Sequence, residues 1–199
     1  EAAYDIVKST QDNGIHIYQQ NFSHPFFLTG YRRLEIYPRS RQMVLRIHVY
    51  RLATPKPQSW YLQFPLNTGN HLPTFSLGGV PFQPGVDQIP GTCQDFYTID
   101  DTVVYQKPAS TLVWSSANSA VVSLGVPQPA ERKRGPLKDV NLLNAMLFDD
   151  FWDCNFSIGA PGPLDFTFHL AELPKDVPLH EALHIGYELT HTLEVSLQN

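Results

Sequence analysis

The chain has 199 residues, of which 42% are hydrophobic and only 17% are charged, and its formal net charge is −5. This length allows one large domain with a sizeable core, and the negative charge argues against nucleic-acid binding, which needs a concentrated basic face. The 17 prolines, spread along the chain, disfavour long helices because proline lacks a backbone N–H. No apolar run is long enough to predict a membrane span.

Alternating apolar and polar residues predict β-strands along most of the chain, since alternation places one set on a core face and the other toward solvent. In chain order, the predicted strands are 33–37, 45–49, 60–64, 96–99, 103–105, 111–114, 120–124, 164–170 and 193–197. Turn signals such as Asn13-Gly14, Gly78-Gly79 and Pro90-Gly91 separate them. Many short strands with frequent turns predict an all-β sandwich. Only residues 178–187 predict a short helix.

Arginines and cysteines carry little functional signal. The arginines are interleaved with strand residues, at positions 32, 33, 39, 41, 46 and 51, and we expect them on solvated strand edges and turns. Two cysteines, Cys93 and Cys154, are too few for a disulfide scaffold. They can pair, but we expect two free thiols, because cysteine packs well as a small apolar residue.

The stretch His180-Glu181-Ala182-Leu183-His184 fits the H-E-x-x-H pattern of zinc peptidases. On a helix, His180 and His184 would share a face and bind zinc, with Glu181 as the general base. The extended pattern requires a third histidine six residues later, whereas His191 follows seven residues later. We therefore interpret the match as fortuitous and keep a zinc peptidase as the least favoured alternative.

Carboxylates and aromatic side chains are candidates for carbohydrate chemistry. A glycosidase needs two carboxylates facing each other across a cleft, and two acidic groups occur, namely Asp95, Asp100 and Asp101, and then Asp149, Asp150 and Asp153. We expect these mainly in turns and at strand ends. Aromatic rings can stack on a sugar, and the candidates are Trp60, Tyr61, Tyr97, Trp114 and Trp152. The tryptophans lie in apolar runs, which favours the core.

Several short stretches of the sequence, taken together and in their order along the chain, resemble the sequence of a known family. They are 60–66 (WYLQFPL), 77–97 (LGGVPFQPGVDQIPGTCQDFY), the strand pair from 111–114 to 123–125, 148–156 (FDDFWDCNF), 164–170, and the spacing of Ala182, Gly186 and Glu188. This series, over residues 30–199, resembles the carboxy-terminal region of glycoside hydrolase family 38, the α-mannosidase-like enzymes. If the resemblance holds, the H-E-x-x-H match falls at a position that has no metal-binding role in that family.

The resemblance implies a fold and a role. The fold is an all-β supersandwich of two large, mostly antiparallel sheets, galactose-mutarotase-like, with residues 1–199 as a single domain of a larger glycosidase. The role is that of a non-catalytic domain, whose partners are the catalytic barrel and the remaining domains. The zinc ion and the catalytic aspartate of the family belong to the barrel, so the resemblance implies no catalytic residue, metal ligand or cofactor in this chain.

The resemblance also suggests a carbohydrate-facing loop. Asp87, Gln88 and Asp95 are the candidates for a loop that reaches the rim of the active site. The alternative is that they cap turns, because aspartate readily accepts hydrogen bonds from nearby backbone N–H groups. A second reading of the whole chain is a free-standing carbohydrate-binding module, which would expose aromatic side chains on one face.

Overall fold

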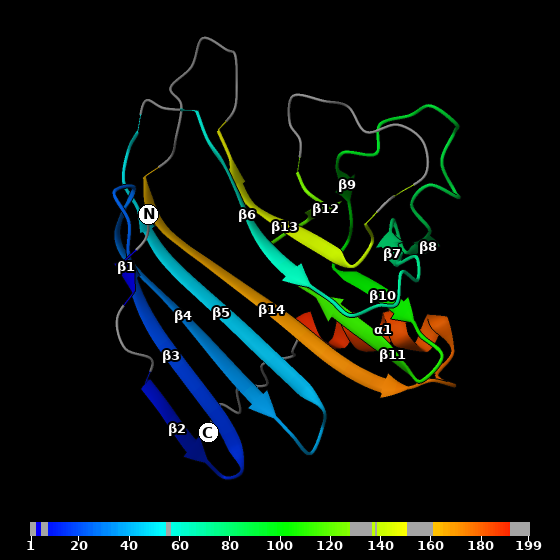
Figure 1. Cartoon of the computed structure of the whole chain (residues 1–199), viewed down its shortest axis with the longest axis horizontal. Helices are drawn as coiled ribbons and strands as arrows, with labels where there is room; N and C mark the ends of the chain where they lie inside the picture. The colour runs from blue at the N-terminus through cyan, green and yellow to red at the C-terminus, as the bar shows by residue number, and fades with distance from the viewer. Residues whose placement is uncertain are drawn as a thin grey trace, which may run out of the picture.

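Two antiparallel β-sheets and one helix make up the fold (Figure 1). The computed structural model describes residues 3–4, 8–54, 57–127, 137, 139–150 and 161–191. The prediction of an all-β fold with two antiparallel sheets and little helix is confirmed. The two sheets differ in size, with ten strands in one and four in the other.

The larger sheet runs across the whole molecule. In spatial order its strands are β1 (Ala3–Tyr4), β3 (Ile15–Ser23), β4 (Phe27–Tyr37), β5 (Gln42–Arg51), β14 (Gly162–Pro174), β11 (Ser110–Ser115), β10 (Thr102–Gln106), β7 (Thr74–Leu77) and β8 (Val80–Phe82), and β2 (Lys8–Asp12) also pairs with β3. The smaller sheet has the order β6 (Ser59–Pro65), β13 (Leu142–Asp149), β12 (Val121–Leu124) and β9 (Tyr97–Thr98).

The main core lies between the two sheets. Phe64 of the smaller sheet contacts Trp114 and Phe168 of the larger one, with ring centroids 5.6 and 5.2 Å apart. Trp114 and Phe168 are fully buried. Aromatic rings at these distances and tilted angles add favourable edge-to-face contacts to the burial of apolar area, so this trio holds the sheets together.

The helix α1 (Leu179–Thr190) packs on the opposite face of the larger sheet (Figure 1). It covers the region predicted as helical from the sequence and extends one turn further. Its buried residues, Ala182 and Gly186, are small, which lets the helix approach the sheet closely. An added Cβ at Gly186 would collide with Thr102. No helix among the described residues is long and apolar enough to cross a membrane.

Part of the larger sheet extends beyond its covering elements (Figure 1). The helix contacts β10, β11 and β14, whereas β3, β4 and β5 continue past it. On the helix side of these strands, the register pairs Tyr31 with His48 and Arg33 with Arg46. Within the described part of the chain, no element packs over this side, which we call the uncovered face.

Candidate functional site

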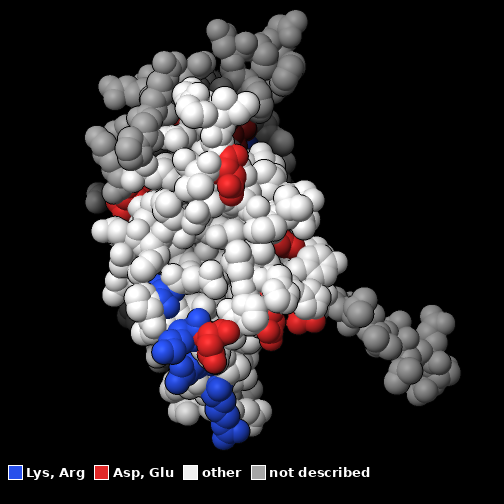
Figure 2. Space-filling view, turned by 90° about the vertical axis from the view of Figure 1, so that its right-hand side faces the viewer, with Lys and Arg blue, Asp and Glu red and all other residues white. Residues whose placement is uncertain are grey.

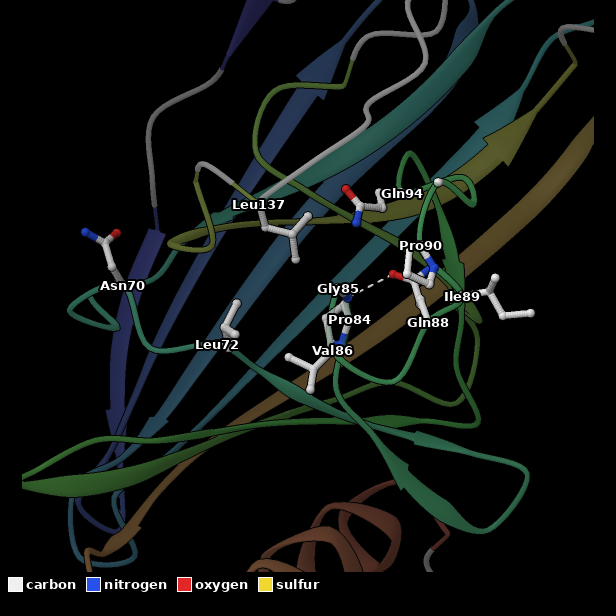
Figure 3. A pocket seen from close by; sticks show the side chains of 11 residues that line it. Asn70, Leu72, Pro84, Gly85, Val86, Gln88, Ile89, Pro90, Gln94 and Leu137 are labelled. Atoms are coloured by element: carbon white, nitrogen blue, oxygen red, sulfur yellow. Dashed lines mark hydrogen bonds between the residues drawn. The ribbon is translucent and has the colours of Figure 1, made fainter.

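The predicted carbohydrate-facing loop connects β8 to β9 and borders a hollow of about 640 Å³. Its lining combines aliphatic side chains with amides, prolines and glycines, and consists of Asn70, Leu72, Pro84, Gly85, Val86, Gln88, Ile89, Pro90, Gly91, Gln94 and Leu137. Figure 3 shows Leu72, Val86 and Leu137 converging from three separate segments of the chain, whereas the Ile89 side chain points away from them. The hollow thus has apolar walls and neutral polar groups.

Gln88 holds this loop in shape through both ends of its amide. Its Oε1 accepts a hydrogen bond from the backbone N–H of Gly85 at 2.8 Å, drawn in Figure 3. Its Nε2 donates to the carbonyl oxygen of Cys93 at 3.1 Å. The Tyr97 hydroxyl also donates to Oε1, at 3.3 Å. Gly85 has a φ of +77°, which glycine adopts without strain. Gln88 therefore links the start of the loop to its end and to β9.

Tyr97 is buried at the base of the loop, with 5% of its surface exposed. Burial raises the pKa of Tyr97 to about 12, and the neighbouring Cys93 and Asp95 raise it as well. The phenol therefore keeps its proton at neutral pH. A protonated phenol can donate its hydrogen bond to Gln88 permanently, so the base of the loop is anchored in the core.

The two predicted aspartates of the loop have local partners. Asp87 accepts a hydrogen bond from the backbone N–H of Gln83 at 2.7 Å. Asp95 accepts one from the thiol of Cys93 at 3.1 Å. Of the three predicted residues, only Gln88 lines the hollow. Asp87 thus has the turn-capping contact that we considered as the alternative, and the carbohydrate-facing role of the three residues stays a prediction.

The prediction of a free thiol is confirmed for Cys93, but its expected packing as a small apolar residue is wrong, because the side chain is exposed. Cys154 lies outside the described residues, and so do Trp152 and Asp153.

The carboxylates after β9 serve the turns around them. Asp100 accepts hydrogen bonds from the backbone N–H groups of Gly78 and Gly79 at 3.0 and 2.9 Å, which fixes the β7–β8 turn. Asp101 is 4% exposed and accepts from the hydroxyls of Ser76 and Thr102 at 3.2 and 2.7 Å. These contacts are those of structural carboxylates in turns.

The carboxylates at the end of β13 also have partners. Asp149 accepts from the Ser59 hydroxyl at 2.5 Å. Asp150 forms an ion pair with Arg51. Arg51 is only 2% exposed, so the expectation that it lies on a solvated edge is wrong. The cause is tertiary, because the buried carboxylate of Asp150 compensates the charge that burial would otherwise penalise.

The histidines of the H-E-x-x-H stretch lie on the helix as the pattern predicts. His180 and His184 are exposed on α1, and His184 lies 3.3 Å from the carboxylate of Glu188. Among residues 8–54, 57–127, 139–150 and 161–191, no three His, Cys, Asp or Glu side chains group as ligands for a metal ion. The stretch thus has two adjacent histidines on an outer helix surface, and no third ligand near them in this part of the chain.

The aromatic candidates for sugar stacking are mostly interior. Trp114 is fully buried, which confirms its expected place in the core. Trp60 is half-buried and lies against Phe27, with ring centroids 4.6 Å apart. Tyr61 is also half-buried and stacks on Phe96. None of these described rings forms the open aromatic face expected of a carbohydrate-binding module.

A scan of known protein families and a search of curated proteins find no match to this chain.

Proposed function

We propose that this chain is a non-catalytic β-sandwich domain of an α-mannosidase-like glycoside hydrolase. In this role it packs against the catalytic barrel through the loop between β8 and β9 and forms part of the wall of the carbohydrate cleft. The proposal starts from the resemblance in sequence, and the observation that carries it is the uncharged hollow beside this loop, whose lining combines apolar and neutral polar groups. Zinc and the hydrolytic carboxylates would belong to the barrel.

The surface at the hollow has the character of a docking surface. Val86 and Leu72, whose side chains converge at the hollow, are 58% and 37% exposed. Grouped aliphatic side chains that remain in water mark contact sites for other protein surfaces. Figure 2 shows that most of the surface on the side of the molecule carrying β7 and β8 is uncharged, with a few separate Asp and Glu patches and with Lys and Arg gathered at one end. Interface centres are likewise depleted of charge.

The chemistry of the described carboxylates also supports a non-catalytic role. Each acidic candidate that the structure describes is bonded to a backbone N–H, a hydroxyl, a thiol or an arginine. A general acid or a nucleophile for glycoside hydrolysis must instead face the substrate across a cleft. The described carboxylates hold turns and strand ends, so we assign hydrolysis to another part of the enzyme.

The first test is the native size of the polypeptide in its source, by size exclusion followed by intact mass. We expect the sequence within a chain several times the 22.5 kDa of the 199 residues, or co-purifying with one. We also expect the isolated chain to lack hydrolytic activity on an aryl α-mannoside. A free polypeptide of 22.5 kDa, or hydrolysis by the isolated chain, would contradict the proposal.

The second test addresses the docking surface in the native, full-length protein. Val86→Lys places a charge on the hollow and should lower the thermal midpoint of the whole enzyme, because a buried unpaired charge is costly. Leu28→Lys is the matched control, since Leu28 is similarly exposed, at 65%, but lies on β4 near the far end of the sheet. Equal effects of the two substitutions would argue against docking at the hollow.

A further inference from the structure

Two arginines lie directly opposite each other on the uncovered face. Arg33 of β4 and Arg46 of β5 are partners in the antiparallel register. Directly opposed side chains start about 5 Å apart at Cβ, and like charges in this arrangement destabilise a sheet. The opposition is therefore unfavourable unless negative charge lies near both guanidinium groups.

Glu35 supplies part of that negative charge and orients both arginines. Its side chain is 10% exposed. Its Oε1 accepts from Arg33 Nε at 2.8 Å and lies 3.7 Å from Arg46 Nε, while its Oε2 accepts from the Tyr37 hydroxyl at 2.7 Å. One carboxylate neutralises one of the two arginines, so the group keeps a net positive charge.

The terminal amino groups of the arginines remain for another partner. Both guanidinium groups face Glu35 through Nε, and the terminal amino groups of Arg33 have no hydrogen-bond partner among the described residues. Arg46 reaches only the Thr167 hydroxyl with Nη1, at the long distance of 3.5 Å. The two side chains are 38% and 48% exposed. A ligand from solvent can therefore reach both of them.

The next row of the same face contains one exposed carboxylate, which is in contact with a histidine. Asp165 carries the other carboxylate close by, and it lies 2.7 Å from Nδ1 of His48. Tyr31 stacks on the His48 ring, with centroids 5.3 Å apart. This carboxylate is therefore already engaged. Tyr31 adds no charge to this row, and with the Asp165 carboxylate beside it His48 adds no net positive charge either.

We infer that Arg33 and Arg46 form a binding site for one oxyanion group of a small ligand, of the class phosphate ester, sulfate ester or carboxylate. The planar donor fork of a guanidinium matches two oxygens of such a group, and charge-assisted bonds of this kind are stronger than neutral ones. Two forks held by one buried carboxylate present such donors in a fixed arrangement. The site is independent of whether the chain belongs to a glycosidase.

The experiment is a titration of the ¹⁵N-labelled full chain, observed by NMR. Sodium phosphate, sulfate and acetate are added separately, with sodium chloride keeping the ionic strength constant. We expect saturable amide shifts centred on residues 31–35 and 44–48 for at least one oxyanion. The anion that binds most tightly identifies the chemical class of the ligand. Chloride alone producing the same shifts, or no saturable shift with any of the three, would overturn the inference.

Three substitutions distinguish a specific anion-binding site from a general effect of positive surface charge. Arg33→Gln and Arg33→Lys should each weaken binding about tenfold, because lysine keeps the charge but lacks the fork. Arg32→Gln is the matched control: Arg32 is adjacent in sequence but its side chain lies on the other face, paired with Gln20. It should leave the affinity unchanged. If Arg33→Lys keeps the full anion affinity, or if Arg32→Gln weakens it equally, then net charge alone explains the binding and the inference is overturned.

Discussion

Arg51 and Asp150 form a buried ion pair that joins the two sheets. Arg51 ends β5 in the larger sheet, and Asp150 follows β13 in the smaller one. Their side chains are 3% and 10% exposed, and Arg51 Nη1 donates to Asp150 Oδ1 at 3.2 Å. The guanidinium also lies over the Phe148 ring, 4.2 Å from its centroid. The pair therefore clamps the sheets beside the core.

We expect Asp150→Ala to lower the free energy of unfolding by about 3–5 kcal/mol, because it leaves the Arg51 charge buried without a partner. Urea denaturation measures the change. Asp165→Ala is the control, since Asp165 also pairs with a basic side chain but is 70% exposed. Exposed pairs contribute about 0–1 kcal/mol. Similar losses in the two variants would mean that the clamp contributes no more than a surface pair.

The close approach of α1 to the sheet predicts the effect of a single methyl group. Gly186→Ala should destabilise the chain by about 1–3 kcal/mol through overpacking against Thr102, although alanine favours a helix. Thermal unfolding measures the effect. Adding Thr102→Ser removes the nearest methyl group and should recover part of the loss. If the two substitutions act additively, then the helix does not depend on this contact.

The Glu35 network predicts a pH dependence of stability. Burial alone would raise the pKa of Glu35, but hydrogen bonds from Tyr37 and Arg33 and the charges of Arg46 and Arg33 outweigh it and hold that pKa below its ordinary value of 4.5. A carboxyl whose pKa is lowered by folding stabilises the fold above its unfolded pKa, and the contribution is lost as the pH falls through the folded pKa.

The stability advantage of the wild type over Glu35→Gln should therefore be greatest near neutral pH and shrink below about pH 4. Chemical denaturation of both proteins at several pH values measures it. Parallel curves from pH 7 to pH 3 would show that Glu35 does not titrate with a lowered pKa. The neighbouring His169 adds its own loss of stability in acid, because burial and the charge of Arg46 lower its pKa, so that the unfolded chain binds the proton more readily than the folded one.

The amide of Gln88 predicts the rigidity of the loop at the hollow. Gln88→Ala removes the acceptor of the Gly85 N–H and should speed hydrogen exchange of that amide about tenfold, in keeping with one hydrogen bond of about 1 kcal/mol. Asp87→Asn is the control, because asparagine keeps an oxygen for the Gln83 N–H. Equal exchange rates of the Gly85 amide in the wild type and in Gln88→Ala would mean that contacts other than the Gln88 amide hold the loop rigid.

Strands with one apolar face could be predicted from the sequence, and those without one could not. Leu45, Ile47 and Val49 alternate with polar residues and lie in β5 as expected. The strand β13 shows no alternation, because its consecutive residues Leu143, Asn144 and Ala145 are all fully buried. The strand β3 was missed for the opposite reason, since most of its residues are half-buried or exposed and it has no continuous apolar face.

The contacts that hold the candidate loop could be predicted as local ones, because aspartate in a turn caps nearby backbone N–H groups. Asp87 and Gln88 bond within the loop that contains them. The Arg33–Arg46 pair had a usable signal as well: the turn-forming residues Pro38-Arg39-Ser40 separate the predicted strands 33–37 and 45–49, and the two arginines are nearly equidistant from them. By contrast, Arg51 and Asp150 meet only through the packing of two sheets, which no local pattern determines.

The position of β14 in the larger sheet sets the order in which the fold can be completed. This strand, near the carboxy-terminal end of the described chain, lies between β5 and β11 and pairs with both. The meander of β2 to β5 can form from local contacts, but its inner edge stays open until residues 162–174 are available. During synthesis, β5 and β11 therefore each keep an open edge that can pair with other molecules until β14 is in place.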